Sequence, residues 1–94
     1  MAEWKSASHL EDHYRDHASE FPGASIADYD ASAQDTLDVG TYFEYFHDAT
    51  GEWRTGCYHR ETGRLTILDA DDRIVSHFRC AESYVRNLTD STYG

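Results

Sequence analysis

The spacing of the apolar residues changes near Gly40, and this change constrains the fold more than any other feature of the chain. Before Gly40, these residues recur every three or four positions, which is the spacing of an amphipathic helix. One stripe comprises Leu10, Tyr14, His17 and Phe21, and a second comprises Ile26, Tyr29, Ala33 and Leu37. We therefore expect two helices in the first half of the chain.

Beyond Gly40, the apolar and aromatic residues fall in short segments separated by turn-forming residues. The turns read DATGE, ETG and DADD, and such short connections suit antiparallel hairpins. The four segments are residues 41–47, 53–60, 64–70 and 73–79. We expect each of them to be a strand, and we expect residues 81–88 to form a short C-terminal helix or a docking arm.

Local signals mark the ends of both helices. The Phe-Pro-Gly sequence at residues 21–23 ends the first, because proline and glycine interrupt helical structure. Ser25, with Asp28 three residues later, resembles a capping signal for the second helix, and Gly40 ends it. The sequence thus predicts one α+β domain over residues 1–94, with two helices packed on one face of a roughly four-stranded antiparallel sheet.

The chain has 18 acidic and 8 basic side chains, which give a formal net charge of −10. This charge argues against nonspecific binding to nucleic acid, which needs cations along the phosphates. The charge is uneven, because residues 1–40 have nine acidic and two basic side chains, whereas residues 41–94 have nine acidic side chains and six arginines. Arginine makes forked contacts with phosphate and carboxylate, so a local anion site is compatible with the acidic chain.

Several functional classes lack their sequence signals. No apolar run is long enough to span a bilayer, and the first residues show no secretory signal pattern, so we expect a cytoplasmic protein. Cys57 and Cys80 do not have the spacing of a zinc pair, and we interpret both as buried thiols. No glycine-rich phosphate loop follows a strand, so we expect no nucleotide cofactor.

The first predicted helix has three histidines at intervals of four residues: His9, His13 and His17. On a helix they form a band beside the apolar stripe, where the helix meets the sheet. One hypothesis is a metal site, although the glutamate of the His-Glu-x-x-His motif is absent. Its third ligand would come from Cys57, His59, His77 or an aspartate. A second hypothesis is a polar helix edge with His17 hydrogen-bonded. A third is general acid–base catalysis by two imidazoles about 6 Å apart.

The sequence HYRDHASEF (residues 13–21) resembles the helix His-x-x-Lys-His-Gly-x-Glu-Phe of small nuclease-like domains from bacteria and phages. These domains have the barnase/EndoU/colicin/RelE-type (BECR) fold of metal-independent, toxin-type ribonucleases. Three further segments resemble the family in the same order: ADYDASAQDTL, YHRETG and IVSHFR. The resemblance covers residues 9–80.

The resemblance implies RNA cleavage, tRNA included, by attack of the 2′-hydroxyl on the adjacent phosphate. His13 and His17 match the helix histidines and would take and return the proton. Ser76 matches the Ser/Thr of the last strand and, with an arginine, would hold the phosphoryl oxygens. The resemblance implies no metal and no cofactor.

Four residues are candidates for substrate binding under the same resemblance. The arginines are Arg60 and Arg79, and the aromatic residues that would stack on a base are Tyr58 and Phe78. The alternation of a strand places Ser76 and Phe78 on one face of the sheet, with Val75 and His77 on the other.

Two positions depart from the family pattern, since Asp16 replaces the lysine and Ala18 the glycine. Asp16 and the net charge of −10 both oppose phosphate binding. The alternative hypothesis is therefore a catalytically silent, acidic interaction domain of the same fold, with a basic protein as its partner. The sequence makes no prediction of the oligomeric state.

The remaining charged and aromatic residues have plainer interpretations. Arg60, Arg64, Arg73 and Arg79 either form a phosphate cradle or pair with nearby acidic residues. We interpret His59 and His77 as cross-strand packing or exposed surface. Trp53 is expected to cover one end of the core as a packing anchor.

Overall fold

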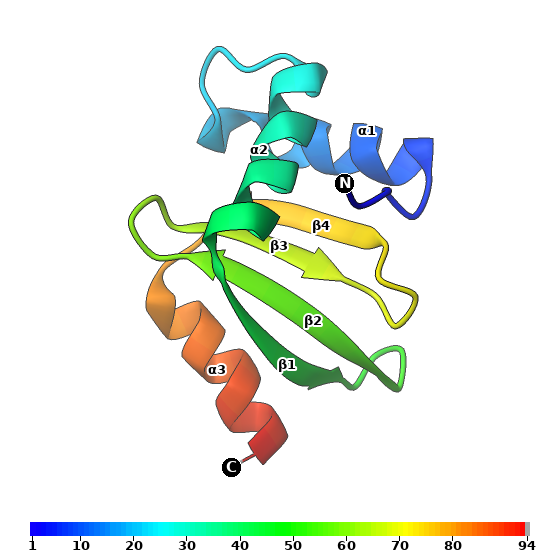
Figure 1. The fold of residues 1–94 in the computed structure, drawn as a ribbon, viewed down its shortest axis with the longest axis vertical. Helices are drawn as coiled ribbons and strands as arrows, with labels where there is room; N and C mark the ends of the chain where they lie inside the picture. Colours follow the sequence, from blue (N-terminus) through cyan, green and yellow to red (C-terminus); the bar gives the residue numbers. More distant parts are fainter. Residues whose placement is uncertain (94) are drawn as a thin grey trace.

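The computed structural model describes residues 1–93, which form three α-helices and one antiparallel sheet of four strands (Figure 1). The helices are α1 (Ala7–His17), α2 (Ile26–Val39) and α3 (Glu82–Tyr93), with a short 3-10 helix, η1 (Ala18–Glu20), after α1. The strands are β1 (Thr41–His47), β2 (Glu52–His59), β3 (Arg64–Leu68) and β4 (Ile74–Arg79). Neighbours in the sheet are also neighbours in the chain, in the order β1-β2-β3-β4.

This architecture confirms the α+β prediction, including the two N-terminal helices, the antiparallel sheet and the C-terminal helix. The structure adds how the helices are distributed. Helix α2 packs on β2 and β3, whereas α1 lies along the outer strand β4 (Figure 1). Helix α3 packs against β1, the strand at the other edge.

Helix α2 begins and ends where its local sequence predicts. The hydroxyl of Ser25 accepts a hydrogen bond from the Asp28 amide (3.1 Å), and the Asp28 carboxylate accepts one from the Ser25 amide (3.0 Å). This reciprocal capping box satisfies two otherwise unpaired amides. At the other end, a Cβ atom on Gly40 would lie 2.7 Å from the Cys57 sulfur, so only glycine fits between α2 and β2.

One face of the sheet packs against α2. Ala33 contacts Leu68 and Ile74 there, and the Thr66 hydroxyl donates to the Ala33 carbonyl over 3.3 Å. The buried Cys57 thiol donates to a helix carbonyl, and burial raises its pKa, as expected of an inert thiol.

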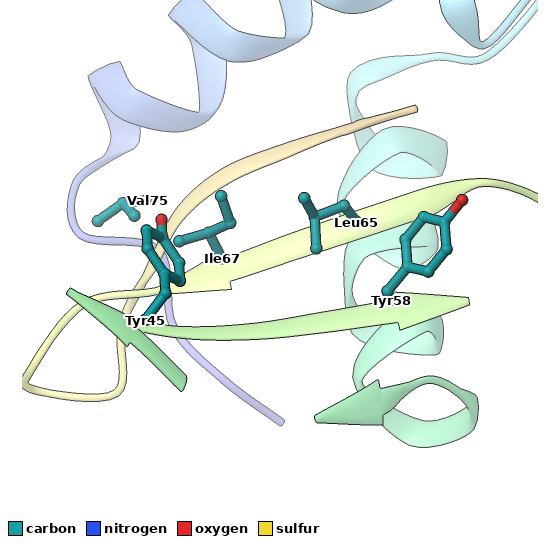
Figure 2. Close-up of a cluster of buried hydrophobic side chains, with 5 residues drawn as sticks. All are labelled: Tyr45, Tyr58, Leu65, Ile67 and Val75. Carbon is teal, nitrogen blue, oxygen red and sulfur yellow. The ribbon is translucent and has the colours of Figure 1, made fainter. Parts of the chain in front are cut away.

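The opposite face carries the main hydrophobic cluster, which Figure 2 shows along the strands. Its buried members are Tyr45, Tyr58, Leu65, Ile67 and Val75. Val85 and Leu88 of α3 cover this cluster and are themselves only partly buried. Both faces of the sheet are therefore covered, α2 lying on one and α3 on the other.

A β-bulge in β4 overturns one sequence prediction. Simple alternation placed Val75 on the face opposite to Ser76. In the structure Ser76 pairs with Ile67, but the next pair joins Leu68 to Ile74, so Val75 is an extra residue in the ladder. An extra residue shifts the alternation by one, and the side chain of Val75 joins the main cluster.

His77 is fully buried between α2 and the sheet. Its Nδ1 lies 2.8 Å from the hydroxyl of Thr66, its direct partner on β3, and its Nε2 lies 3.0 Å from the hydroxyl of Ser32 on α2. The ring also stacks on Phe21, at 5.1 Å between centroids. The interpretation of His77 as cross-strand packing is confirmed.

Burial lowers the pKa of His77 to about 4, with smaller contributions from its neighbours. Its pKa in the unfolded chain is about 6.5, so unfolded chains bind more protons between these two values. We therefore predict that the His77 contribution to the free energy of unfolding falls by about 3 kcal/mol as the pH decreases from 6.5 to 4. Urea denaturation at several pH values measures this. His77→Gln should flatten this part of the profile.

Candidate functional site

A cavity of about 390 Å³ lies on the α3 side of the sheet, between α1, β4 and α3. We call it the histidine pocket. Its polar lining comes from three regions far apart in the sequence, and its floor is part of the main hydrophobic cluster. The lining residues are His9, His13, Tyr45, His47, Arg54, Ile67, Val75, Ser76, Phe78, Tyr84 and Leu88.

Two of the predicted catalytic residues, His13 and Ser76, both line the histidine pocket. The Nδ1 atom of His13 on α1 lies 3.5 Å from the Oγ atom of Ser76 on β4, although 63 residues separate them in the chain. The two side chains meet because α1 lies along β4 and because Ser76 points away from α2. A hydroxyl and an imidazole at the mouth of one cavity can act on the same small ligand.

The three histidines of α1 form a column of stacked rings. The centroids of His9 and His13 lie 6.2 Å apart, and those of His13 and His17 lie 5.9 Å apart with only 7° between the ring planes. The column ends on Phe78, 5.4 Å from His17. Nitrogen lone pairs lie in the plane of an imidazole, so rings stacked in this way do not direct them at one ion. Within residues 1–93, no three or more His, Cys, Asp or Glu side chains are placed to share a metal.

His17 does not line the pocket but closes one end of the histidine column. Its Nδ1 lies 2.6 Å from one carboxylate oxygen of Glu20, and the other oxygen accepts a hydrogen bond of 2.7 Å from the Arg79 amide. Glu20 therefore ties the end of α1 to the end of β4. This contact fixes the orientation of the His17 ring, and the stacked His13 ring lies against it.

His13 has a lowered pKa, chiefly because it is partly buried and secondly because His17 and His9 are close. The carboxylates of Asp16 and Asp12 oppose this shift without cancelling it. A neutral imidazole can accept a proton, whereas an imidazolium cannot. The lowered pKa of His13 thus favours its neutral form, and its Nδ1 lies 3.5 Å from the Ser76 hydroxyl.

Arg54 is the cation of the histidine pocket, and our sequence analysis did not identify it. Its side chain is only 15% exposed, and its Nε donates to the Glu52 carboxylate over 3.1 Å. A signal was present, because alternation along β2 places Arg54 on the same face as Tyr58. Arg60 and Arg79 were expected to bind substrate instead, because both lie in stretches that resemble the family, YHRETG and IVSHFR.

The predicted substrate-binding residues divide between two places. Phe78 lines the histidine pocket, whereas Tyr58 and Arg60 line a second cavity of about 300 Å³ on the other side of α3. The Tyr58 hydroxyl donates to the Cys80 carbonyl (2.9 Å), and Arg60 lies 3.6 Å from the Glu82 carboxylate. Helix α3 thus separates these two residues from His13.

The Arg79 guanidinium donates hydrogen bonds to the backbone carbonyls of nearby residues. Its Nε and Nη2 atoms donate to the Thr62 carbonyl over 3.1 and 2.9 Å, and its Nη1 donates to the Glu20 carbonyl over 3.3 Å. These bonds hold the β2–β3 turn against the end of β4. They leave the Arg79 guanidinium outside the residues that line the histidine pocket.

The arginine cradle considered for the second half of the chain does not form. Arg64 pairs with Asp35 on α2 over 3.0 Å. Arg73 pairs with Asp69 and Asp71 inside its own turn over 3.3 and 3.1 Å. Ion pairing, the plainer interpretation, is therefore confirmed for these arginines.

The lining of the histidine pocket has the composition of an anion site. It combines one guanidinium, three imidazoles and the hydroxyls of a serine and two tyrosines. None of the lining residues drawn from the described chain, residues 1–93, carries a carboxylate, although Glu52, outside the lining, pairs with the Nε atom of Arg54 over 3.1 Å. The acidic chain thus has a pocket lined by groups that are able to donate hydrogen bonds to an anion.

Comparisons with protein-family models, curated proteins and solved structures find no match for the chain. The resemblance to BECR-type ribonucleases consequently stays a prediction from the sequence. Among the residues that the structure describes, no helix is long and apolar enough to cross a membrane.

We predict that a small tetrahedral anion binds in the histidine pocket. Titration with sodium sulfate at constant ionic strength should shift the NMR signals of His13 and Ser76. Arg54→Gln should weaken this binding at least tenfold, because it removes the only guanidinium of the lining. Arg86→Gln is the matched control, since its side chain is exposed on α3 and pairs with Glu82. Equal loss in both variants would refute a local site.

Proposed function

We propose that the histidine pocket binds an RNA phosphate and cleaves the chain there without a metal. The observation that carries this proposal is the contact between His13 and Ser76 in a cavity whose lining also includes Arg54. A base, a hydroxyl donor and a guanidinium are the groups that phosphoryl transfer requires when no metal takes part. The RNA substrate is proposed to be cytoplasmic, with tRNA as one candidate.

In the proposed reaction, His13 accepts the proton of the ribose 2′-hydroxyl as this oxygen attacks the adjacent phosphorus. The bond from phosphorus to the 2′-oxygen forms and the bond to the 5′-oxygen breaks, leaving a 2′,3′-cyclic phosphate and a 5′-hydroxyl. Arg54 and the Ser76 hydroxyl stabilise the charge on the phosphoryl oxygens. The lowered pKa of His13 keeps it in the form that accepts a proton.

The 5′-oxygen needs a proton as it leaves, and His9 is the proposed donor. Its Nδ1 lies 2.9 Å from the Ser6 hydroxyl, and since His9 lines the pocket, its Nε2 is the nitrogen that is proposed to donate. Its ring stacks 6.2 Å from that of His13, a separation that spans the attacking and leaving oxygens of one phosphate. His17, held by Glu20, is proposed to position His13 rather than to touch the substrate.

The alternative function is a catalytically silent interaction domain that binds a basic protein. The observation favouring it is the net charge of −10, together with Asp12 and Asp16 on the helix that carries His13. These carboxylates repel a polyanion such as RNA and attract a cationic protein. In that case the histidine pocket would have no reactive role.

The test is cleavage of total tRNA and of a short single-stranded RNA in the presence of EDTA. We expect His13→Ala to decrease the cleavage rate by a factor of about 10² to 10⁴, which is the usual contribution of a general base. His59→Ala is the matched control, because His59 bonds Thr62 in a turn away from the pocket. No cleavage by the folded wild type at low salt would exclude the nuclease and favour the interaction domain.

The pH profile adds an independent prediction. Since the pKa of His13 is lowered from 6.5, the acid limb of the rate should lie below pH 6.5. Neutralising Asp16 as Asp16→Asn removes a carboxylate that raises this pKa, so the acid limb should move to still lower pH. A limb that stays in place in this variant would assign the base to another residue.

A further inference from the structure

Four aromatic side chains of β1, β2 and α3 have rings that are exposed to solvent, and the proposed reaction uses none of them. They are Tyr42 (54% exposed), Phe46 (38%), Trp53 (50%) and Tyr93 (68%). We call them the aromatic patch. The sequence predicted that Trp53 would anchor the core, but half of its surface faces solvent. An exposed tryptophan among other exposed aromatic residues is typical of an interaction site.

The sheet pairing brings three of these side chains together, whereas Tyr42 lies four residues before Phe46 on β1 and its hydroxyl donates to the Leu37 carbonyl over 2.7 Å. Phe46 is the direct partner of Trp53 in the β1–β2 ladder, and their rings meet edge to face at 5.7 Å. Tyr93 belongs to the last turn of α3, and its ring centroid lies 6.2 Å from that of Trp53. The patch is therefore built by three elements of regular structure, and its shape is fixed before any partner arrives.

No helix covers this part of the sheet. Helix α2 packs over β2 and β3, and in Figure 1 the end of β1 and the start of β2 lie beyond its reach. Alternation along β1 places Tyr42 and Phe46 on the face opposite to Tyr45, which belongs to the main cluster under α3. The side chains that β1 and β2 contribute to the aromatic patch thus lie on the face of the sheet opposite to the histidine pocket.

The charges around the aromatic patch are negative. Glu44 is exposed on β1 between Tyr42 and Phe46, on the same face. Asp38 is close enough to Tyr42 to contribute to the raised pKa of that phenol, after the effects of burial and of Cys57. Arg54, the nearest arginine in the sequence, points to the opposite face and into the histidine pocket.

The edge of the sheet beside the aromatic patch is already occupied. The Thr92 hydroxyl accepts a hydrogen bond of 2.9 Å from the Phe46 amide, and the Tyr93 hydroxyl donates to the Glu44 carbonyl over 3.4 Å. A partner strand cannot use these backbone groups while α3 holds them. Recognition at this place therefore depends on side chains rather than on strand addition.

We propose that the aromatic patch is a docking site for an arginine-rich or lysine-rich segment of another protein. Exposed aromatic faces attract guanidinium and ammonium groups, and the carboxylate of Glu44 lies among them. Charge complementarity selects a cationic partner over RNA and over a second copy of this acidic chain. The proposal goes beyond the reaction at the histidine pocket and does not depend on it.

The first measurement follows the two indole N–H signals of the protein by NMR during titration with a nona-arginine peptide. We expect the Trp53 signal to move and the Trp4 signal to stay in place. Trp4 is an internal control, because its indole N–H donates to Asp30 over 2.8 Å in a half-buried position. Equal movement of both signals would overturn the proposal, since it would report binding without a defined site.

Calorimetric titration of variants with the same peptide distinguishes binding at the aromatic patch from binding that depends only on the net charge. Glu44→Gln should raise Kd about tenfold, and Glu11→Gln, which removes the same charge from an exposed position on α1, should change it less than twofold. Trp53→Leu keeps an apolar side chain but removes the ring, and it should also raise Kd about tenfold. If Glu44→Gln and Glu11→Gln weaken binding equally, net charge alone explains the binding and the proposal fails.

Two further outcomes would assign the aromatic patch to another occupant. A single-stranded oligouridine that moves the Trp53 signal more than the peptide does would indicate base stacking. A dimer in sedimentation experiments that Trp53→Leu dissociates would indicate a second copy of the chain. Either result overturns the basic partner, and neither depends on whether the histidine pocket cleaves RNA.

Discussion

The packing of the helices on the sheet in this small domain depends on the hydrogen bonds of the buried His77 imidazole. This ring bonds Thr66 on β3 through one nitrogen and Ser32 on α2 through the other, so it links helix and sheet inside the core. The Tyr29 hydroxyl donates to the backbone carbonyl of the same residue, and the Tyr29 ring packs on Trp4, beside the start of α1. Because α2 is fixed to β3 and β4 in this way, α1 has a defined surface along β4. The position of His13 relative to Ser76 follows from that surface.

Distance explains how an anion site and a net charge of −10 can coexist. At physiological ionic strength charges are screened over about 8 Å, so carboxylates on remote surfaces have little effect within the histidine pocket. The lining itself contains Arg54, imidazoles and hydroxyls, which act at contact distance. The carboxylates that do reach His13, those of Asp12 and Asp16, only reduce the lowering of its pKa. The side chains that line the pocket thus determine which small ligand it attracts, whereas the net charge determines which molecules approach the rest of the surface.

Most of the fold could be predicted because its signals are local. The turns DATGE and ETG delimit the strands, and Ser25 with Asp28 marks the start of α2 through bonds between near neighbours. The bulge at Val75 could not be predicted, because it depends on how β3 and β4 align rather than on β4 alone. The site divides in the same way. The face on which Ser76 lies could be predicted from the alternation along its strand. The presence of Arg54 in the histidine pocket could not, because it depends on how α3 packs on the sheet.

Trp53 shows a related limit. Its residue type is typical of a core anchor, and only the extent of α2 decides that the start of β2 is left uncovered. The length and position of a helix over a sheet are set by packing, which a single sequence reports poorly. The same argument applies to Arg60 and Tyr58, which were placed near His13 until the structure showed α3 between them.

The last turn of α3 has a consequence for how the protein behaves at high concentration. An edge strand with free amides and carbonyls is a template on which other chains can add strands and aggregate. In this protein Thr92 and Tyr93 bond the amide of Phe46 and the carbonyl of Glu44 on the edge strand β1. Two side chains at the end of a helix therefore make these two backbone groups unavailable to a strand from another chain. They do so at an edge that contains neither proline nor lysine, the residues that often prevent strand addition.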